Sequence, residues 1–444
     1  FMLLRETMDA PIFSNPDYLS KIQGKGLNPL LQNYWMTIHP PTLFLGFAST
    51  VIPFCFAIAA LINKKYTEWL KPVLPWALFS AFILGMGILM GAAWAYEALS
   101  FGGYWAWDPV ENMSLVPWLI LIAALHSNVV SNATRYSTKP TFVLYIISFI
   151  LVLYSTFLTR SGVLGDTSVH AFTEMGLEWQ LTIFMIFFTV WAGWLFFRNA
   201  KHIYVPKEEE KLNSREFWIF IGTLVLVFSS VLITFTTSIP VFNKLFDAFG
   251  SLTGKDMSYL HRTAPTDAVA HYNKYQMWIA VLIGILSGVA QYFRYKAFSW
   301  GTTIPKMLKS VLISMALAAS MTWLTTYWIN LVSWQYYILC FVGYFGIFAN
   351  LDYFIFYLKN NLKLSASVLS HLGFGVMIIG VLASGLNKRH ISENRFALEG
   401  ILDEDKIGKN IVLLKGVPMV MNDFKVTYLS DTMYNHTKEF NINY

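Results

Sequence analysis

The sequence predicts an all-α polytopic membrane protein with about ten transmembrane helices and a small, β-rich extracytoplasmic segment at its C-terminus. The chain has 444 residues, of which 55% are hydrophobic and only 13% are charged, whereas soluble domains are about 25% charged. Ten runs reach the roughly 20 apolar residues that a spanning helix needs. Both cysteines, Cys55 and Cys340, lie inside such runs, and no CxxC or CxxCH is present. A disulfide scaffold, a thiol oxidoreductase and a c-type cytochrome are therefore excluded.

In chain order, the sequence predicts three domains. Residues 1–39 form an extracytoplasmic segment, residues 40–388 form the transmembrane bundle, and residues 389–444 form the β-rich domain. The ten predicted spans are 40–62, 73–95, 113–131, 141–160, 179–197, 217–240, 275–293, 310–329, 334–358 and 368–387. The connection 241–274 is predicted to be a long outer loop.

The positions of Lys and Arg predict the orientation of the bundle. With residues 1–39 outside the cytoplasm, the inner loops contain sixteen of these residues and the outer segments before the C-terminal domain contain eight. Cytoplasmic loops carry the excess of positive charge in membrane proteins, which favours this orientation. A net charge of +6 spread over membrane loops argues against nucleic acid as a partner.

Residues 389–444 have a different pattern. Alternating stretches at 411–414 and 424–428 are separated by Gly, Asn and Asp, as in short strands joined by turns. The chain ends within another such stretch, 440–444, so we expect this domain to be incomplete. The first residues lack the layout of a signal peptide and are typical of the middle of a loop.

Two histidines lie inside predicted spans at matched depth. His126 is about 8 Å from the inner end of its span, and His371 is about 5 Å from the inner end of its own. Ionisable residues in a membrane usually face the bundle interior for a functional reason. Hydrogen bonds to neighbouring helices would explain either histidine alone, but their matched depth favours two axial ligands of one haem.

Two further histidines, His39 and His170, are predicted at the outer surface. His39 precedes Pro40 and Pro41, which we expect to set the start of the first helix. His170 lies in the short loop between the fourth and fifth spans. Each alone is most simply an interfacial histidine, but together they flank the densest aromatic cluster of the chain.

This cluster, residues 94–118, is predicted to be a haem surface. It contains Trp94, Tyr104, Trp105, Trp107 and Trp118, interleaved with Glu97, Asp108, Glu111 and a Gly-Gly pair. An aromatic belt explains scattered rings but not three carboxylates beside such a turn. Trp105 and Trp107 can share one face only if their backbone is non-helical, because residues two apart diverge by about 200° on a helix. Arg160, at the edge of the adjacent loop, could pair with the acids or with a haem propionate.

These segments resemble the CcmF/CcsA family of haem-handling proteins of cytochrome c maturation, and within it the CcmF haem lyase component most. The matching segments, in the family's order, are GLNPLLQ (26–32), IHPP (38–41), GGYWAWDPVENMSLVPW (102–118), FLTRSG (157–162) with SVHA (168–171), and HLG (371–373). Phe101 stands where the family often has Trp, so an N–H donor is lost there. Family members carry further helices before the first matched segment, which indicates an incomplete chain or one part of a split protein.

The resemblance implies a role for each of these residues. In the family, two outer histidines ligate a haem that rests on the tryptophan-rich segment, and they correspond to His39 and His170. Two membrane histidines ligate a permanent haem b, and they correspond to His126 and His371. The implied haem contacts also include Trp94, Tyr104, Trp105, Trp107, Trp118 and Arg160, and the implied catalytic set is His39, His170, Trp105, Trp107 and Asp108.

The implied activity is that of a cytochrome c haem lyase, in which the cysteine thiols of a CxxCH motif in apocytochrome c add across the haem vinyl groups. The buried haem b would pass electrons from a membrane quinol to the substrate haem b. The implied partners are apocytochrome c, a haem chaperone and an apocytochrome thiol carrier. The implied location is the bacterial inner membrane or an equivalent organellar membrane, with the aromatic platform on the extracytoplasmic side.

Two other classes of protein stay open at this point. A haem b-containing quinol oxidoreductase without ligation activity would use the buried pair but not the outer pair. A polytopic transporter would place charged residues at mid-membrane on broken helices, whereas the clearest charges here lie at loop edges. The number of bound haems separates the three classes: two for a lyase, one for the oxidoreductase and none for a transporter.

Overall fold

The computed structural model describes residues 17, 27, 29–98, 103–165, 168, 177–206, 211–293, 295, 300–387, 412–421, 424–434 and 437–444. The chain divides into two compact units, Tyr34–Asn387 and a second unit that combines Phe1–Asn33 with Lys388–Tyr444. Within the described residues, ten helical segments are long and apolar enough to cross a membrane, and a small antiparallel sheet lies near the C-terminus. The predicted fold class is confirmed.

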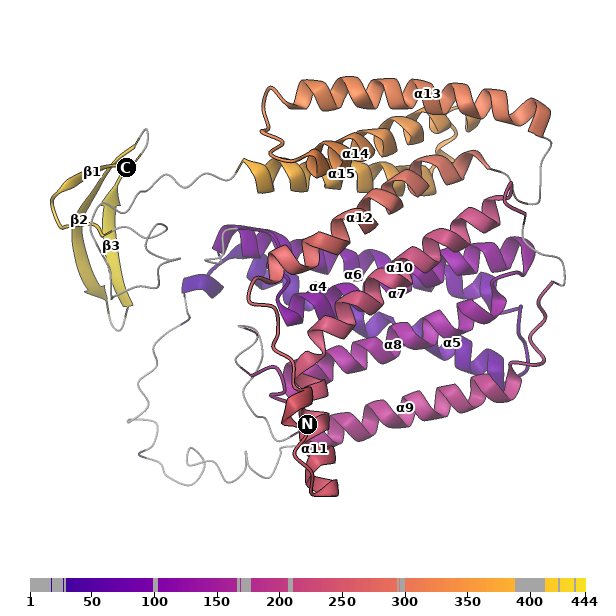
Figure 1. Ribbon diagram of the computed structural model, residues 1–444, viewed down its shortest axis with the longest axis horizontal. Coiled ribbons are helices and arrows are strands. Elements are labelled where there is room, and N and C mark those ends of the chain that lie inside the picture. Colours follow the sequence, from indigo (N-terminus) through magenta and orange to yellow (C-terminus); the bar gives the residue numbers. More distant parts are fainter. Residues whose placement is uncertain are drawn as a thin grey trace. The chain divides into compact units, whose positions relative to one another are not determined.

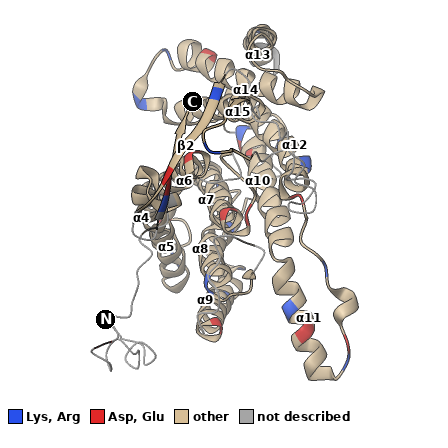
Figure 2. Ribbon diagram, turned by 90° about the vertical axis from the view of Figure 1, so that its left-hand side faces the viewer, with Lys and Arg blue, Asp and Glu red and all other residues tan. Residues whose placement is uncertain are grey.

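The spanning segments follow one another along the chain (Figure 1). They are α4 (Tyr34–Ser49) continued by α5 (Val51–Ile62), α6 (Leu70–Ala98), α7 (Pro109–Thr134), α8 (Thr138–Arg160), α9 (Glu178–Asn199), α10 (Arg215–Thr237), α12 (Ala268–Val289), α13 (Trp300–Thr325), α14 (Trp334–Asp352) continued by a π-helical turn (Tyr353–Tyr357), and α15 (Ala366–Leu386). Charged residues are sparse along these helices (Figure 2), as burial in lipid requires.

The helices form two groups that meet at α10 and α12. In the first group, α7 is central and packs against α6, α8 and α10, while α4 packs against α6 and α9 against α8. In the second group, α14 is central and packs against α12, α13 and α15. The core of the first group contains Met113, Val116 and Leu121 of α7, which are fully buried.

The first helix begins earlier than predicted. α4 starts at Tyr34, so His39, Pro40 and Pro41 lie inside the helix and not at its start. A proline inside a helix removes one backbone hydrogen bond and crowds the carbonyl four residues earlier, yet α4 continues through the pair. The hydroxyl of Thr42 donates to the Ile38 carbonyl at 2.8 Å in the same turn. His39 is therefore carried by a rigid helix.

The connection 241–274 was predicted to be a loop, and this prediction is wrong. It contains α11 (Ile239–Thr253) and a 3-10 turn (Ser258–Leu260), and His271 already lies on α12. Leu245, Phe249 and Leu252 recur at helical spacing and are exposed. That periodicity is the signal of an amphipathic helix.

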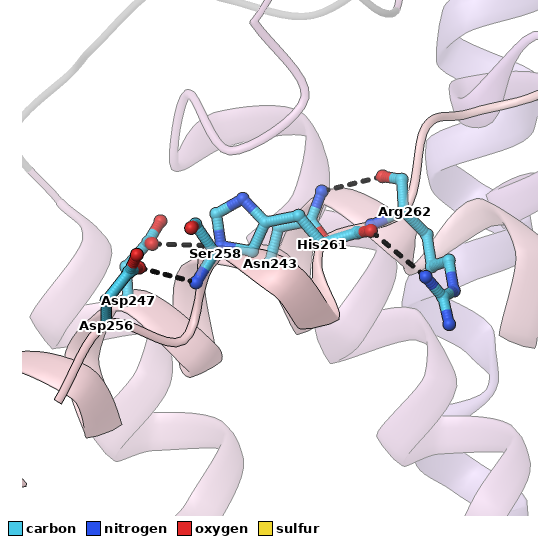
Figure 3. Close-up of polar contacts among 6 residues, drawn as sticks. All are labelled: Asn243, Asp247, Asp256, Ser258, His261 and Arg262. Atoms are coloured by element: carbon cyan, nitrogen blue, oxygen red, sulfur yellow. Dashed lines mark hydrogen bonds and ion pairs between the residues drawn. The ribbon is translucent and has the colours of Figure 1, made fainter.

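Polar contacts fold the segment after α11 back onto the helix (Figure 3). The side chain of Asn243 donates to the Arg262 carbonyl at 2.8 Å and accepts from the Arg262 N–H at 3.0 Å. The ring of His261 lies 2.9 Å from the carboxylate of Asp247. The carboxylate of Asp256 accepts from the backbone N–H of Ser258 at 2.9 Å.

The C-terminal sheet consists of β1 (Pro418–Met421), β2 (Phe424–Tyr434) and β3 (Thr437–Asn443), antiparallel in this order. The stretches predicted at 424–428 and 440–444 fall in β2 and β3. Residues 412–414 form no strand, and Ile411 lies outside the described residues. The Tyr428 hydroxyl donates to Asp431 and, with Lys438 and Lys415, holds the pKa of that carboxyl well below its usual range.

Candidate functional site

The predicted site residues gather at two levels of the helical unit. We call the end where α4 begins, α6 ends and α7 begins the tryptophan end. The opposite end is where α7 ends and α10 and α15 begin. His39 and the residues of 103–118 are near the tryptophan end, whereas His126 and His371 lie toward the opposite end.

The structure brings His126 of α7 and His371 of α15 together across the boundary between the helix groups. Their ring centroids are 6.1 Å apart, and the ring planes make an angle of 32°. Nδ1 of His126 lies 2.8 Å from the Ile122 carbonyl oxygen, one turn earlier on α7. Because a carbonyl only accepts, Nδ1 carries the proton, and the lone pair on Nε2 is the one available to a metal.

This separation fits a metal between the two rings. Imidazole–metal bonds of about 2.0 Å on both sides place the ring centroids roughly 6 Å apart. Among the described residues, no cluster of three or more His, Cys, Asp and Glu side chains surrounds the pair. A haem needs only axial ligands from the protein, because its macrocycle provides the equatorial nitrogens. The two imidazoles therefore suit haem iron better than a bare metal ion.

At the tryptophan end, residues 103–108 connect α6 to α7 as a non-helical segment held by a capping box. The Asp108 carboxylate accepts from the Val110 N–H at 2.9 Å. The Glu111 carboxylate accepts from the backbone N–H groups of Ala106 and Asp108, each at 3.0 Å. These bonds satisfy the unpaired donors at the start of α7 and hold the loop in one conformation.

Trp107 ties this loop to α10 and α12. Its φ of +57° is uncommon for a residue other than glycine, and several contacts hold it there. Its indole stacks on Tyr272 at 4.9 Å and donates to the Asn273 side chain at 2.9 Å. Asn112 donates to the Trp107 carbonyl and to the Thr237 hydroxyl, both at 3.1 Å. The contacts compensate the unfavourable backbone conformation.

Beside this loop is an open pocket with an empty volume of about 490 Å³, lined by residues that include His39, Gly91, Trp94, Trp105 and Glu111. The rings of His39 and Trp94 stack with centroids 6.4 Å apart. Nδ1 of His39 lies 2.7 Å from the Gly87 carbonyl oxygen, which places the lone pair on Nε2. Nε1 of Trp105 is buried, and it has no hydrogen-bond partner among the described residues. A ring nitrogen and an unsatisfied donor in one pocket suit a ligand with a metal and acceptor groups.

Two glycines of α6 make room for this arrangement, and neither was identified from the sequence. A Cβ added at Gly91 would lie 2.6 Å from Cε1 of His39, and one at Gly87 would lie 2.7 Å from Cα of Leu43. The spacing Gly87-x-x-x-Gly91 is the small-residue pattern that lets membrane helices approach closely, and it could have identified both positions.

The other predicted aromatic residues have different surroundings. The rings of Trp105 and Trp107 meet at 88° with centroids 6.0 Å apart, so these two do not form one flat shelf. Trp118 donates from Nε1 to the Ala81 carbonyl at 2.9 Å and packs α7 on α6. Tyr104 stacks on Tyr96 at 4.4 Å.

Of the two basic residues Arg160 and His170 that were predicted for the site, the structure describes only Arg160. Arg160 is the last residue of α8 and is half-buried. His170 lies outside the described residues, as does Phe101. Ser168, two residues before His170 in the chain, donates from its hydroxyl to the Asp108 carboxylate at 2.8 Å. The loop that carries His170 is therefore attached to the capping box at Ser168.

Comparison with known proteins agrees with this architecture. Residues 17–164 match the family model described as cytochrome C assembly protein. CcmF of Escherichia coli strain K12 is 31% identical over 309 residues, which are 68% of this chain and 44% of that protein. CycK of Bradyrhizobium diazoefficiens is 48% identical over 152 residues, 34% of this chain and 23% of that protein. The chain belongs to the CcmF/CcsA family.

A solved structure, "Cytochrome c Heme Lyase CcmF", has the same fold as this CcmF/CcsA-family chain. The TM-score is 0.57 at 23% identity, and the match covers 79% of this chain and 52% of that one. The chain spans about half the length of the relatives it matches, or less. The family assignment made from the sequence and the multi-pass membrane architecture are confirmed.

Proposed function

We propose that this chain acts in cytochrome c maturation as a cytochrome c haem lyase, holding haem in two places. The observation that carries the proposal is the pair of imidazoles, His126 and His371, at a metal-bridging separation in a member of a cytochrome c assembly family. The pocket lined by His39 and Trp105 would be a separate place for a substrate.

His126 and His371 would be the axial ligands of a buried haem b. The Ile122 carbonyl fixes the tautomer and direction of the His126 ring, as outer hydrogen bonds do for most metal-ligating histidines. When bound, this haem supplies one-electron redox chemistry, which would relay electrons from a membrane quinol toward the outer site. Both rings come from rigid helices, one in each group, so their separation is set by helix packing.

At the tryptophan end, His39 and His170 would ligate the substrate haem beside Trp94 and Trp105. In the reaction, each cysteine S–H of the apocytochrome adds across a vinyl group, forming one C–S and one C–H bond with no leaving group. The chain's contribution is to align the vinyl groups and to exclude competing geometries. Tyr104 and Arg160 would border the haem. Trp107 and Asp108, which hold the loop, and Trp118, which packs α7 on α6, would be positioning residues.

The orientation and partners follow from the same proposal. The excess of Lys and Arg in the loops at the opposite end supports an orientation with the tryptophan end on the extracytoplasmic side. The membrane would be the bacterial inner membrane or an equivalent organellar membrane. Apocytochrome c and haem would be substrates, and a haem chaperone and an apocytochrome thiol carrier would deliver them.

The test is the absorption spectrum and haem content of the purified chain, before and after dithionite. We expect two haems per chain under haem-replete expression and one retained low-spin b-type haem after extensive washing. His126→Ala and His371→Ala should each reduce the amount of retained haem per chain at least tenfold. Added imidazole should restore a low-spin spectrum. His202→Ala, at an exposed loop position, is the matched control and should change nothing.

Other results would assign the chain differently. One haem under all conditions, with holocytochrome c formation unaffected by His39→Ala and His170→Ala, would indicate an oxidoreductase limited to the buried pair. A low-spin b-type spectrum that survives both His126→Ala and His371→Ala would contradict the assigned ligands, and no haem under any condition would contradict the proposal.

A further inference from the structure

A half-buried arginine lies at the opposite end of the bundle and has no role in the function proposed above. Arg215 is the first residue of α10 and is half-buried. Its Nε atom is inaccessible to solvent and donates no hydrogen bond to any described residue. Its guanidinium lies over the ring of Tyr295, 5.3 Å from the centroid. Among the described residues, no carboxylate forms an ion pair with Arg215.

A partly buried cation that has no carboxylate partner among the described residues is costly. Burying a charge without a partner destabilises the folded state, and a positive charge at a helix N-terminus is on the unfavourable side of the helix dipole. The contact with Tyr295 compensates only part of this, because a cation–π contact contributes about 0.5–2 kcal/mol. The position of Arg215 therefore points to an anion that binds there.

Arg215 also begins a helix that packs against the helix of His126. α10 lies directly against α7. α10 begins at the end of the bundle where α7 finishes and α15 begins. His126 and His371 are about 12 Å and about 8 Å along their helices from that end. An anion attached to a group held between the two rings would reach Arg215 from inside the bundle.

From this arrangement we propose that Arg215 binds a propionate carboxylate of the haem held by His126 and His371. The inference rests on the proposed buried haem. A guanidinium is suited to this role because it presents a planar fork of donors to a carboxylate and stays charged when buried. The propionate edge of the haem would then face the opposite end, with the apolar edge between the helices.

The pairing has a consequence for the redox behaviour of this chain. A cation beside the macrocycle disfavours the ferric form, which is one charge more positive than the ferrous form. Arg215 would therefore raise the midpoint potential of the buried haem and favour the ferrous state.

The experiment compares two haems on three proteins. Haem-free protein from haem-limited cells is reconstituted with haem b or with its dimethyl ester, which lacks the propionate charges. The proteins are wild type, Arg215→Gln and Arg198→Gln. Arg198 is the matched control, because its guanidinium also lies over an aromatic ring, that of Trp194 at 5.2 Å, and it belongs to the same positive-inside set. The readouts are the dissociation constant and the midpoint potential.

We expect wild type to bind haem b at least tenfold more tightly than the ester, and Arg215→Gln to lose this preference. We expect Arg215→Gln to lower the midpoint potential, where a tenfold change in the ratio of ferric to ferrous affinity is 59 mV. Arg198→Gln should match wild type in both readouts.

The outcomes separate this inference from the proposal on which it rests. If wild type binds neither haem, the buried haem and the role of Arg215 fail together. If wild type binds haem b and its ester equally, or if Arg215→Gln keeps the wild-type preference and potential, the role of Arg215 is overturned while the histidine ligands stand. The comparison of haem b with its ester on wild type needs no variant, so it decides the matter even if Arg215→Gln does not fold.

Discussion

Two tryptophans near the same end of the bundle use their indole N–H groups differently. Trp118 donates to the Ala81 carbonyl at 2.9 Å, whereas Nε1 of Trp105 is buried, with no acceptor among the described residues. A buried donor without a partner costs about 1–3 kcal/mol. In the ligand-free protein, Trp105 is therefore a destabilising side chain beside a pocket, which is typical of a residue selected for binding.

Replacing each indole with phenylalanine tests this difference. Trp105→Phe removes the unsatisfied donor and should leave the free energy of unfolding unchanged or raise it by about 1 kcal/mol. Trp118→Phe removes the hydrogen bond from the indole to the Ala81 carbonyl and should lower the free energy of unfolding by about 1 kcal/mol. Denaturant titration of the haem-free protein in detergent measures both. Equal losses from the two variants would show that the Trp105 N–H has a partner after all.

The contact between Gly91 and His39 gives a second prediction for a single residue. Gly91→Ala should force His39 away from the Gly87 carbonyl, because the added Cβ would lie 2.6 Å from the ring. We expect a loss of about 1–3 kcal/mol of stability and loss of the substrate haem, with the buried haem retained. Gly380→Ala is the control, since a Cβ there meets nothing within 4 Å; as a helical Gly→Ala change, it should be neutral or stabilising. A stable Gly91→Ala protein with both haems would contradict the packing.

For single residues, the sequence predicted which residues belong to the candidate site and how deep the histidines lie in the membrane. It did not predict the direction in which each side chain points. His126 and His371 could be paired because apolar runs define depth. The perpendicular rings of Trp105 and Trp107 could not be predicted, because the positive φ of Trp107 is set by Tyr272 and Asn273, more than 160 residues away in sequence.

Among the elements, the N-terminus of α7 does most to hold the tryptophan end together. Asp108 caps the helix and also accepts from Ser168 in the loop that carries His170. Asp108→Ala should therefore cost about 1–2 kcal/mol from the lost cap and should also release that loop. Both effects can be measured, by unfolding and by the amount of substrate haem retained.

The control for this prediction is another N-cap. Asp267 caps α12 by accepting from the Ala270 N–H at 2.8 Å, and Asp267→Ala should lose a similar amount of stability. Only Asp108→Ala should also lose substrate haem. If both variants retain it equally, Asp108 acts as a cap and nothing more.

The membrane-spanning helices were predictable, because a run of about 20 apolar residues seldom forms any other structure. α11 was missed since its length is below that threshold and its apolar residues recur at helical spacing between polar ones. The start of α4 was placed too late, because its first turn contains the polar segment before Pro40 and Pro41, and proline was read as a helix start.

At the scale of the whole molecule, the proposed buried haem would be a link between two helix groups. The first group has the larger core, and 72% of the apolar window of α7 is buried. The second group is packed less extensively, and 39% of the corresponding window of its central helix, α14, is buried. A haem ligated by His126 and His371 would bind only the assembled bundle, and any such ligand stabilises the assembly by about 2.7 kcal/mol at a hundredfold excess over its dissociation constant.

The last prediction follows from this difference in burial between the two helix groups. Protein from haem-limited cells should show faster hydrogen exchange in α12 and in α14–α15 than haem-loaded protein, with α7 and α8 much less affected, because their core does not depend on the link. His371→Ala should reproduce this pattern under haem-replete expression, whereas His202→Ala should not. Exchange that rises equally in both groups would mean that haem stabilises the bundle as a single unit. If exchange is unchanged in the haem-free protein, contacts between α10 and α12 alone hold the groups together, and the buried haem has a redox role without a structural one.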